Sequence, residues 1–325
     1  MQHWTRRKSI LAIGSLALAA VNTAYSKQTW PSRPITLTVG YPPGGGSDTM
    51  ARLVASKMAP LIGESIVINN RPGAAGQIAS AYVARSDADG YTLLIDASSF
   101  AINLGLNLDL TYTRQSFVPI GLLALFPLVL VAYPGFEAQN VADLIALAKA
   151  RPKSVFYASA GNGTIPQIAG AMLMKLAQIE LTHVPYKGAG PALNDVMAGQ
   201  VQIFFANAAA ALPLVHAGKL RALAVTGNDR LTDLPDIPTL AETSAGPLNA
   251  QEWIGMYAPA ATPLEIVDRL SAALRQSLQD EEVRKRVVAL SGEVFTGSRA
   301  ESTKFIDGEI KAMAEIIQER GIKGQ

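Results

Sequence analysis

The residues of this 325-residue chain that are best placed for binding chemistry are glycines between strand-like and helix-like segments. The stretch Tyr41-Pro-Pro-Gly-Gly-Gly-Ser-Asp48 follows Ile35–Val39, which is rich in β-branched residues, and precedes apolar residues at helical spacing from Met50 onward. Glycines let the backbone turn tightly with unshielded N–H groups, and we expect Ser47 or Asp48 to cap the helix. Because the first N–H groups of a helix lack partners and carry partial positive charge, the loop is suited to a carboxylate or phosphate, unless the glycines serve only the turn.

The same design returns later in the chain. Ser159-Ala-Gly-Asn-Gly-Thr164 leads into a helix with Pro166 in its first turn, and Tyr186-Lys-Gly-Ala-Gly190 leads into another helix. Helix N-termini that face each other across a cleft would hold an anion at both ends. The uncharged donors that would complement carboxylate oxygens, unless they act only as caps or turn residues, are Ser47, Ser98, Ser99, Ser159, Asn162, Thr164 and Asn207.

Catalytic and metal-binding patterns are missing from the sequence. His183 and His216 lie in apolar stretches, which favour a packed histidine over a general base. There is no Gly-x-Ser-x-Gly elbow, no His-Glu-x-x-His, no cysteine, and no lysine after Gly46 to complete a nucleotide-binding loop. We therefore expect no enzyme activity, no metal and no cofactor. Aromatic residues that could line a pocket, although core packing is the default for each, are Tyr41, Tyr186, Trp253 and Tyr257.

Alternating strand and helix patterns must position these loops. Strands are predicted at 35–39, 65–70, 91–96, 155–158, 181–185, 201–205 and 253–258, and helices at 78–85, 141–150, 165–178, 191–198, 266–278, 282–290 and 300–320. The apolar segment 118–133 is predicted to form one or two buried strands that cross between two lobes, and 220–226 is predicted to carry the chain back. The alternation implies an α/β fold whose ligands bind outside the carboxyl ends of parallel strands.

The first residues have the pattern of an export signal. Arg6-Arg7-Lys8 precedes Ile10–Val21, which is too short to span a bilayer, and Ala24 and Ser26 are small residues where a signal peptidase reads. We predict a signal peptide at residues 1–26, with export by the general or the twin-arginine route, and a periplasmic mature protein without disulfides. Removing the three basic residues of the signal peptide leaves 25 basic and 26 acidic residues in the mature chain, a near-neutral balance that disfavours nucleic acid as a partner.

Further motifs are spread along the chain. Besides the loops 41–48 and 159–164, they are Asn70-Arg-Pro-Gly-Ala-Ala-Gly76, Asp89-Gly-Tyr-Thr-Leu93, His183-Val-Pro-Tyr-Lys-Gly188, Gly218-Lys-Leu-Arg-Ala-Leu-Ala-Val-Thr226 and Leu234-Pro-Asp-Ile-Pro-Thr239. With these motifs the chain resembles the extracytoplasmic receptors of tripartite tricarboxylate transporters, also called Bug-type receptors, over nearly all of its predicted mature part, from Trp30 to Ile322. The resemblance implies a two-lobed, type II periplasmic-binding-protein (Venus flytrap) fold that closes on a small organic acid. Lobe 1 would comprise residues 27–124 plus 227–325, and lobe 2 residues 125–226.

The resemblance also nominates ligand-binding residues. In the family the opening loop (here residues 41–48) and the second glycine loop (here residues 159–164) hold one carboxylate, partly through backbone N–H groups. The far end of the ligand is set by variable residues, and where the family usually has aspartate this chain has Ala206. We therefore expect a more apolar pocket that favours an aliphatic or aromatic carboxylate over an amino acid. The nominated residues are Gly44, Gly45, Gly46, Ser47, Asp48, Ser159, Gly161, Asn162, Gly163 and Thr164 for the carboxylate, Ser98, Ser99, Tyr186 and Asn207 for the far end, and Tyr41 as a further ligand-binding residue.

Together these patterns predict a monomeric periplasmic solute-binding receptor without catalytic activity. It would hand a mono-, di- or tricarboxylate to membrane transporter subunits. The alternative is a receptor whose closed form reports the solute to a sensor kinase, since both roles need the same bound state. An enzyme acting on a carboxylic acid is disfavoured by the missing nucleophile and base, and a DNA-binding regulator by the missing helix-turn-helix before residue 27.

Overall fold

The computed structural model describes residues 30–106, 109–186, 188–248 and 250–323. Within it, residues 33–325 form one compact unit. The predicted signal peptide at residues 1–26 lies outside the described residues and stays a prediction.

The described strands form a 10-stranded sheet in the order β2-β1-β3-β9-β4-β7-β5-β6, with β8 and β10 paired to β4. On one side, β1, β2 and β3 pair in parallel, and β9 runs antiparallel to β3 and β4. On the other side, β5 pairs in parallel with β6 and β7. The strands are β1 (Ile35–Val39), β2 (Ile66–Asn70), β3 (Thr92–Ala97), β4 (Phe117–Ala132), β5 (Phe156–Ser159), β6 (Thr182–Pro185), β7 (Ile203–Asn207), β8 (Arg221–Val225), β9 (Gln251–Pro259) and β10 (Glu293–Val294).

Helices alternate with these strands, as the apolar periodicity predicts. Two described helices were not predicted: α4, which begins directly after Ser98, and α8, which the alanine run after Asn207 forms. Helix α8 is almost entirely apolar and lacks the polar face that makes a helical pattern readable, and α4 has only 7 residues, too few for a periodic pattern to show. The helices are α2 (Gly46–Ile62), α3 (Gln77–Ala84), α4 (Ser99–Gly105), α5 (Val141–Ala150), α6 (Ile165–Ala177), α7 (Ala189–Met197), α8 (Ala208–His216), α9 (Leu264–Ser277), α10 (Glu281–Ala289) and α11 (Arg299–Arg320), with short 3₁₀ turns η1 (Ala74–Gly76), η2 (Arg114–Ser116) and η3 (Leu240–Glu242).

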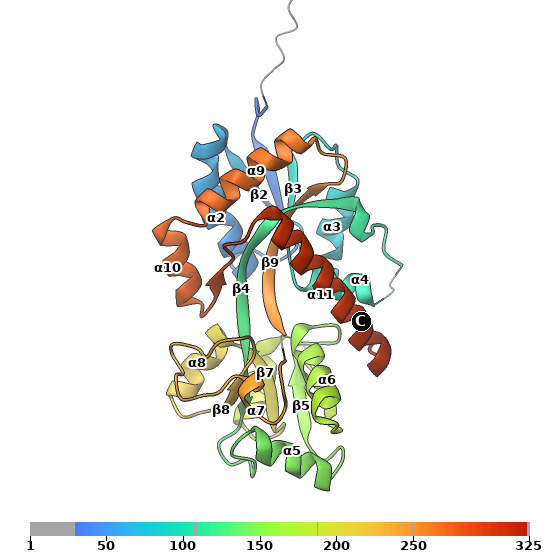
Figure 1. Cartoon of the computed structure of the whole chain (residues 1–325), viewed down its shortest axis with the longest axis vertical. Coiled ribbons are helices and arrows are strands. Elements are labelled where there is room, and N and C mark those ends of the chain that lie inside the picture. The colour runs from blue at the N-terminus through green and yellow to red at the C-terminus, as the bar shows by residue number, and fades with distance from the viewer. Residues whose placement is uncertain (1–29, 107–108, 187, 249, 324–325) are drawn as a thin grey trace, which may run out of the picture. The chain divides into compact units, whose positions relative to one another are not determined.

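Strand β4 belongs to both halves of the sheet, as Figure 1 shows for the long green strand. Its first part, up to Pro127, pairs with β9, and its second part, from Leu128, pairs with β7 and β8. The predicted crossing segment is therefore one continuous strand. Because almost all of its side chains are buried, the segment shows no polar alternation in the sequence.

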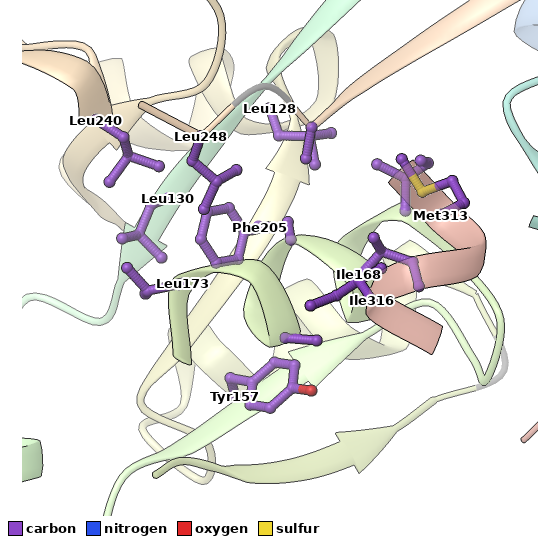
Figure 2. Close-up of a cluster of buried hydrophobic side chains, with 14 of the residues drawn as sticks. Leu128, Leu130, Tyr157, Ile168, Leu173, Phe205, Leu240, Leu248, Met313 and Ile316 are labelled. Carbon is purple, nitrogen blue, oxygen red and sulfur yellow. The ribbon is translucent and has the colours of Figure 1, made fainter. Parts of the chain in front are cut away.

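The return connection differs from the prediction. Segment 220–226 forms β8, which pairs with the second part of β4, and the chain does not leave that half of the sheet there. Leu240 and Leu248 pack with Leu128, Leu130 and Phe205 in one hydrophobic core, visible in Figure 2. The chain therefore returns through β9, because burying these leucines keeps the intervening segment beside β4 and β7. The predicted lobe boundary at residues 226–227 stays a prediction, and this packing favours a boundary near the start of β9.

Helix α11 joins elements of both halves. It packs against α4, β4 and α6, consistent with its diagonal course in Figure 1. Its Met313 and Ile316 lie against Ile168 of α6 in the buried cluster of Figure 2. Two ion pairs extend this contact, Lys175 to Glu319 at 2.5 Å and Arg320 to Glu180 at 3.2 Å. The last turns of the chain are thus tied to the half of the sheet that carries the second glycine loop.

Candidate functional site

The opening loop joins β1 to α2. The helix begins at Gly46 with Gly45 as its N-cap, and no side chain caps it, so the prediction that Ser47 or Asp48 is the cap is wrong. The glycine-rich turn starts the helix two residues earlier than expected, which places Asp48 inside the first turn. Among the described residues, the backbone N–H groups of Gly46 and Ser47 donate no hydrogen bond. They are exposed or half-exposed and free to meet an anion.

The buried carboxylate of Asp48 holds this loop from inside. It accepts hydrogen bonds from Gly44 N at 2.9 Å, Arg52 Nε at 2.9 Å and Asn70 Nδ2 at 2.8 Å. The same Asn70 nitrogen also donates to the carbonyl of Tyr41 at 3.0 Å. The hydrogen bond from Arg52, helped by those from Gly44 and Asn70, lowers the pKa of Asp48 to about 2. Asp48 was predicted to contact the ligand, whereas its oxygens are committed to the loop.

A second carboxylate, Asp96 at the end of β3, anchors the tyrosine of the opening loop. Tyr41 Oη donates to Asp96 Oδ1 at 3.0 Å and forms a further short hydrogen bond with Ser99 Oγ. Asp96 also accepts from Ser80 Oγ at 2.7 Å and from its neighbour's backbone N–H at 2.8 Å. Burial raises the pKa of Asp96 to about 6, against the opposing effect of these donors. The hydroxyl of Tyr41 is thus held by a buried carboxylate.

Gly76 leaves the space that the Asp96 carboxylate occupies. Its φ is +90°, and a Cβ built there would lie 2.6 Å from Asp96 Oδ1. Gly76 also packs backbone to backbone against Gly40, which precedes the opening loop. The glycine-rich turn at residues 71–76 is thus used for close packing. Sequence reasoning missed Asp96, although a lone carboxylate that ends the apolar run Leu93–Ile95 was a usable signal.

The second glycine loop follows β5 and opens α6. Ser159 Oγ is 2.6 Å from His183 Nε2, and Gln167 Nε2 is 3.3 Å from His183 Nδ1. Gln167 Oε1 accepts from Gly163 N at 2.7 Å, and Ser159 Oγ donates to Gly161 O at 2.9 Å. With neutral His183 protonated at Nε2, every donor in this chain of contacts has an acceptor.

His183 is therefore a packed histidine with both ring nitrogens hydrogen-bonded, the role favoured from the sequence, and these bonds position the loop. Thr164 Oγ1 adds a bond to Gly161 O at 2.7 Å. Among the described residues, the backbone N–H groups of Asn162 and Thr164 donate no hydrogen bond. As in the opening loop, side chains hold the backbone from behind, and main-chain N–H groups remain for a ligand.

The pH dependence of stability should report on this arrangement. Burial lowers the pKa of His183 to about 4, from 6.5. The unfolded chain takes up a proton near pH 6.5 that the folded chain resists, so stability present above pH 6.5 is lost as the pH falls toward 4. Because His183 is only partly buried, solvent screening reduces the effect, and the expected loss is about 2 kcal/mol relative to His183→Gln, which cannot titrate. Urea unfolding of both proteins from pH 4 to 8 measures it, and parallel pH profiles would contradict it.

Tyr186 and Asn207, which were also predicted to bind the ligand, form hydrogen bonds to other residues of the protein. Tyr186 Oη donates to Asp195 Oδ2 at 2.7 Å. Asn207 caps α8 through Oδ1, which accepts from Ala209 N at 3.0 Å, and its Nδ2 donates to Glu252 Oε2 at 2.7 Å. Ser98 is buried at the N-terminus of α4. Glu252 is a second carboxylate that the sequence analysis missed.

Helix α4 connects the two loops. It begins at Ser99, which contacts Tyr41, and a Cβ built on Gly163 would lie 3.1 Å from Leu106 Cδ1 at the other end of the helix. None of the hydrogen bonds among the described residues joins the 41–48 loop directly to the 159–164 loop. Helix α4 therefore contacts Tyr41 of the opening loop at its start and approaches Gly163 of the second glycine loop at its end, while each loop is held by its own hydrogen bonds.

The described residues line several cavities. One of about 660 Å³, lined among others by Arg230, Phe295 and Glu309, contains none of the predicted residues. Another of about 320 Å³ is bordered by Asn162 and His183. The described residues contain no cluster of three or more His, Cys, Asp or Glu suited to a metal ion, and no described helix combines the length and apolarity needed to cross a membrane.

Comparison with known proteins agrees along nearly the whole chain. The sequence model of the tripartite tricarboxylate transporter family receptor matches residues 50–322. Protein BugT of Bordetella pertussis is 34% identical over 322 residues, which are 98% of this chain and 98% of BugT.

Solved structures are also similar. An R. palustris protein solved with adipate is 32% identical, with a TM-score of 0.77, and the match covers 90% of this chain and 99% of that protein. MatC from Rhodopseudomonas palustris, solved with bound malate, is 29% identical, with a TM-score of 0.73, covering 89% and 100% of the two chains.

These similarities confirm the predicted two-lobed α/β fold of periplasmic binding proteins. The matched family is one of receptors, which confirms a binding protein rather than an enzyme. Since the family model covers most of the chain and BugT aligns almost end to end, the chain belongs to the tripartite tricarboxylate transporter receptor family.

Proposed function

We propose that the chain is a periplasmic receptor that binds a small organic carboxylate and presents it to the membrane subunits of a transporter. The observation that carries the proposal is the shared design of the two glycine loops. In each, buried side chains occupy the rear of the loop and leave main-chain N–H groups at a helix N-terminus, of α2 and of α6. Such groups favour a carboxylate through both hydrogen bonds and the helix dipole.

Relatives support the ligand class. One solved relative contains adipate and another malate, both small carboxylates. The ligand-binding residues proposed here are Tyr41, Gly44–Asp48, Ser98, Ser99, Ser159, Gly161–Thr164, Tyr186 and Asn207, with Asp48 and Ser159 acting through the loop backbone. Export through residues 1–26, the monomeric state and the transporter subunits remain predictions. No described feature favours the sensing alternative.

A thermal-shift screen of residues 27–325 against small organic acids tests the function. A ligand that binds only the folded state at about a hundredfold excess over Kd adds about 2.7 kcal/mol of stability. We expect stabilisation by at least one carboxylate and none by neutral sugars. Stabilisation by sugars alone would contradict a carboxylate receptor.

One substitution tests the backbone N–H mechanism. Gly46→Pro removes a single N–H at the first helical position, where proline is tolerated, and a Cβ at Gly46 meets nothing within 4 Å. A hydrogen bond to a charged group contributes about 1.5–3 kcal/mol, so carboxylate affinity should fall about 10- to 100-fold with little change in stability. Gly46→Ala keeps the N–H and should lose far less affinity. Equal affinities for the two variants in isothermal titration would rule out this donor.

A further inference from the structure

The cavity of about 320 Å³ that Asn162 and His183 border is a second candidate binding site. Its walls come from β5, α6, the segment that leads into β6, and the end of α11, which packs against α6. Asn162 is the one lining residue that also belongs to the proposed carboxylate site. The cavity is therefore formed by side chains to which no role has yet been given.

The side chain of Tyr157 reaches the cavity from β5. Its ring packs on Gly170 of α6, where a Cβ would lie 2.3 Å from Tyr157 Cε2. The residue is only 2% exposed, yet its hydroxyl takes part in none of the hydrogen bonds within the described part of the chain. In Figure 2 the hydroxyl points away from Leu130 and Leu173. Since buried tyrosine hydroxyls usually have a partner, this one is available to a ligand in the cavity.

Arg320, in the last turn of α11, is also incompletely hydrogen-bonded. Its Nη1 donates to Glu180 Oε1 at 3.2 Å, and among the described residues the guanidinium donates no other hydrogen bond. Its Nε is buried without a partner. Burial raises the pKa of Tyr157 and the charge of Arg320 lowers it, which agrees with a guanidinium near the phenol hydroxyl. Two donors that lack acceptors therefore belong to the same cavity.

The charge of the cavity is positive. Glu180 is the one acidic residue among those that line it, and it is already paired with Arg320. Lys323, which also lines the cavity, makes none of the ion pairs found between described residues. His183 adds no charge near neutral pH, because burial lowers its pKa to about 4 and both of its ring nitrogens are hydrogen-bonded. The cavity thus combines unused donors with one cation in excess.

From these contacts we propose that the cavity binds a small oxyanion, inorganic phosphate above all, held by the hydroxyl of Tyr157, the guanidinium of Arg320 and the ammonium of Lys323. The planar fork of a guanidinium matches the oxygens of phosphate, and charge-assisted hydrogen bonds are the strong ones. A carboxylate offers the same kind of acceptor with fewer oxygens and less charge. The site is separate from the proposed carboxylate site, because it uses side chains of β5 and α11 rather than main-chain N–H groups at a helix N-terminus.

Isothermal titration of the wild-type protein with phosphate, sulfate and acetate, in a buffer without other oxyanions, tests the site. We expect saturable binding of one phosphate per chain. Tyr157→Phe keeps the ring on Gly170 and removes only the hydroxyl, so phosphate affinity should fall about tenfold without a lower unfolding temperature. Tyr133→Phe removes a tyrosine hydroxyl beside a different cavity and should bind phosphate like the wild type.

A second pair of variants tests the charge. Lys323→Gln removes the unpaired cation from the cavity, and phosphate affinity should fall about twofold to fivefold, since an exposed charge acts through solvent. Lys304→Gln removes an exposed lysine of α11 that does not line the cavity, and it should leave the affinity unchanged. Equal losses in the two variants would show that only the overall charge of the protein matters, which contradicts the site.

Gly46→Pro separates the oxyanion site from the proposed carboxylate site, because it should weaken carboxylate binding and leave phosphate binding unchanged. If phosphate and sulfate give no saturable heat, or if Tyr157→Phe and Tyr133→Phe bind phosphate equally, the oxyanion site is wrong while the carboxylate receptor stands. If phosphate affinity falls in Gly46→Pro instead, phosphate occupies the opening loop and the inference is also wrong. Tighter binding of acetate than of phosphate, with the same loss in Tyr157→Phe, would contradict the assignment to phosphate. If no organic acid binds but phosphate binding still depends on Tyr157, the proposed function fails and the oxyanion site stands.

Discussion

Replacing Asp96 with alanine is expected to lower the free energy of unfolding by about 3–5 kcal/mol, since removing one partner of a buried polar network strands the others. Three donors would lose their acceptor: Ser80 Oγ, Tyr41 Oη and the backbone N–H after Asp96. Tyr41 would also lose its anchor beneath the opening loop, so ligand affinity should fall together with stability. Urea unfolding and isothermal titration at pH 7.5 measure the two effects.

Asp96→Asn is the matched variant. It keeps an acceptor oxygen, and its amide can donate to the hydroxyls of Ser80 or Tyr41, so the loss should be much smaller than for alanine. The folded pKa of Asp96 is raised to about 6, so its contribution to stability is fully present below its unfolded value near 3.8 and is lost as the pH rises through 6. The free energy of unfolding of the wild type should therefore rise relative to that of Asp96→Asn as the pH falls from 7 to 4. If Asp96→Ala lowers the free energy of unfolding no more than Asp87→Ala, a change at an exposed aspartate, the hydrogen bonds of Asp96 do not stabilise the fold.

Asp48→Ala is expected to release the opening loop, with a loss of about 2–3 kcal/mol in the free energy of unfolding, because Gly44 N and Asn70 lose a buried charged acceptor. Carboxylate affinity should fall by about tenfold or more, since the N–H groups of the loop are no longer held in place. The loss of affinity separates this residue from a purely structural one. Isothermal titration with the acid identified by thermal shift measures it.

Arg52→Ala is the control for Asp48→Ala. Arg52 is about half exposed, at 53%, so losing its ion pair should matter much less than losing the carboxylate it contacts. The pKa of Asp48 is lowered to about 2, so its contribution is present above its unfolded pKa near 3.8 and disappears as the pH falls through 2. Wild type and Asp48→Asn should therefore converge in stability near pH 2. Persistent separation in acid would contradict the assigned role.

Local pattern was sufficient for most of the fold. Helix α5 was predicted with the observed bounds, Val141–Ala150, because its apolar residues recur at helical spacing between Asn140, an N-cap, and Pro152. The glycine loops were readable for the same reason: strand, glycines and helix follow one another directly, and the requirement for a tight turn is local. The predicted export signal and the family motifs are also patterns of consecutive residues, and the family that the motifs indicated is the one found.

The tertiary structure alone decided which side chains support the site. Tyr41 meets Asp96 across 55 residues, Asn207 meets Glu252 across 45, and Ser159 meets His183 across 24. Each pair depends on the register between strands and helices that are separate in sequence, and a change of one residue in a strand would turn its side chain to the other face. Residue types showed that carboxylates and a histidine were present. Their roles came from packing, which places each one beside a particular partner.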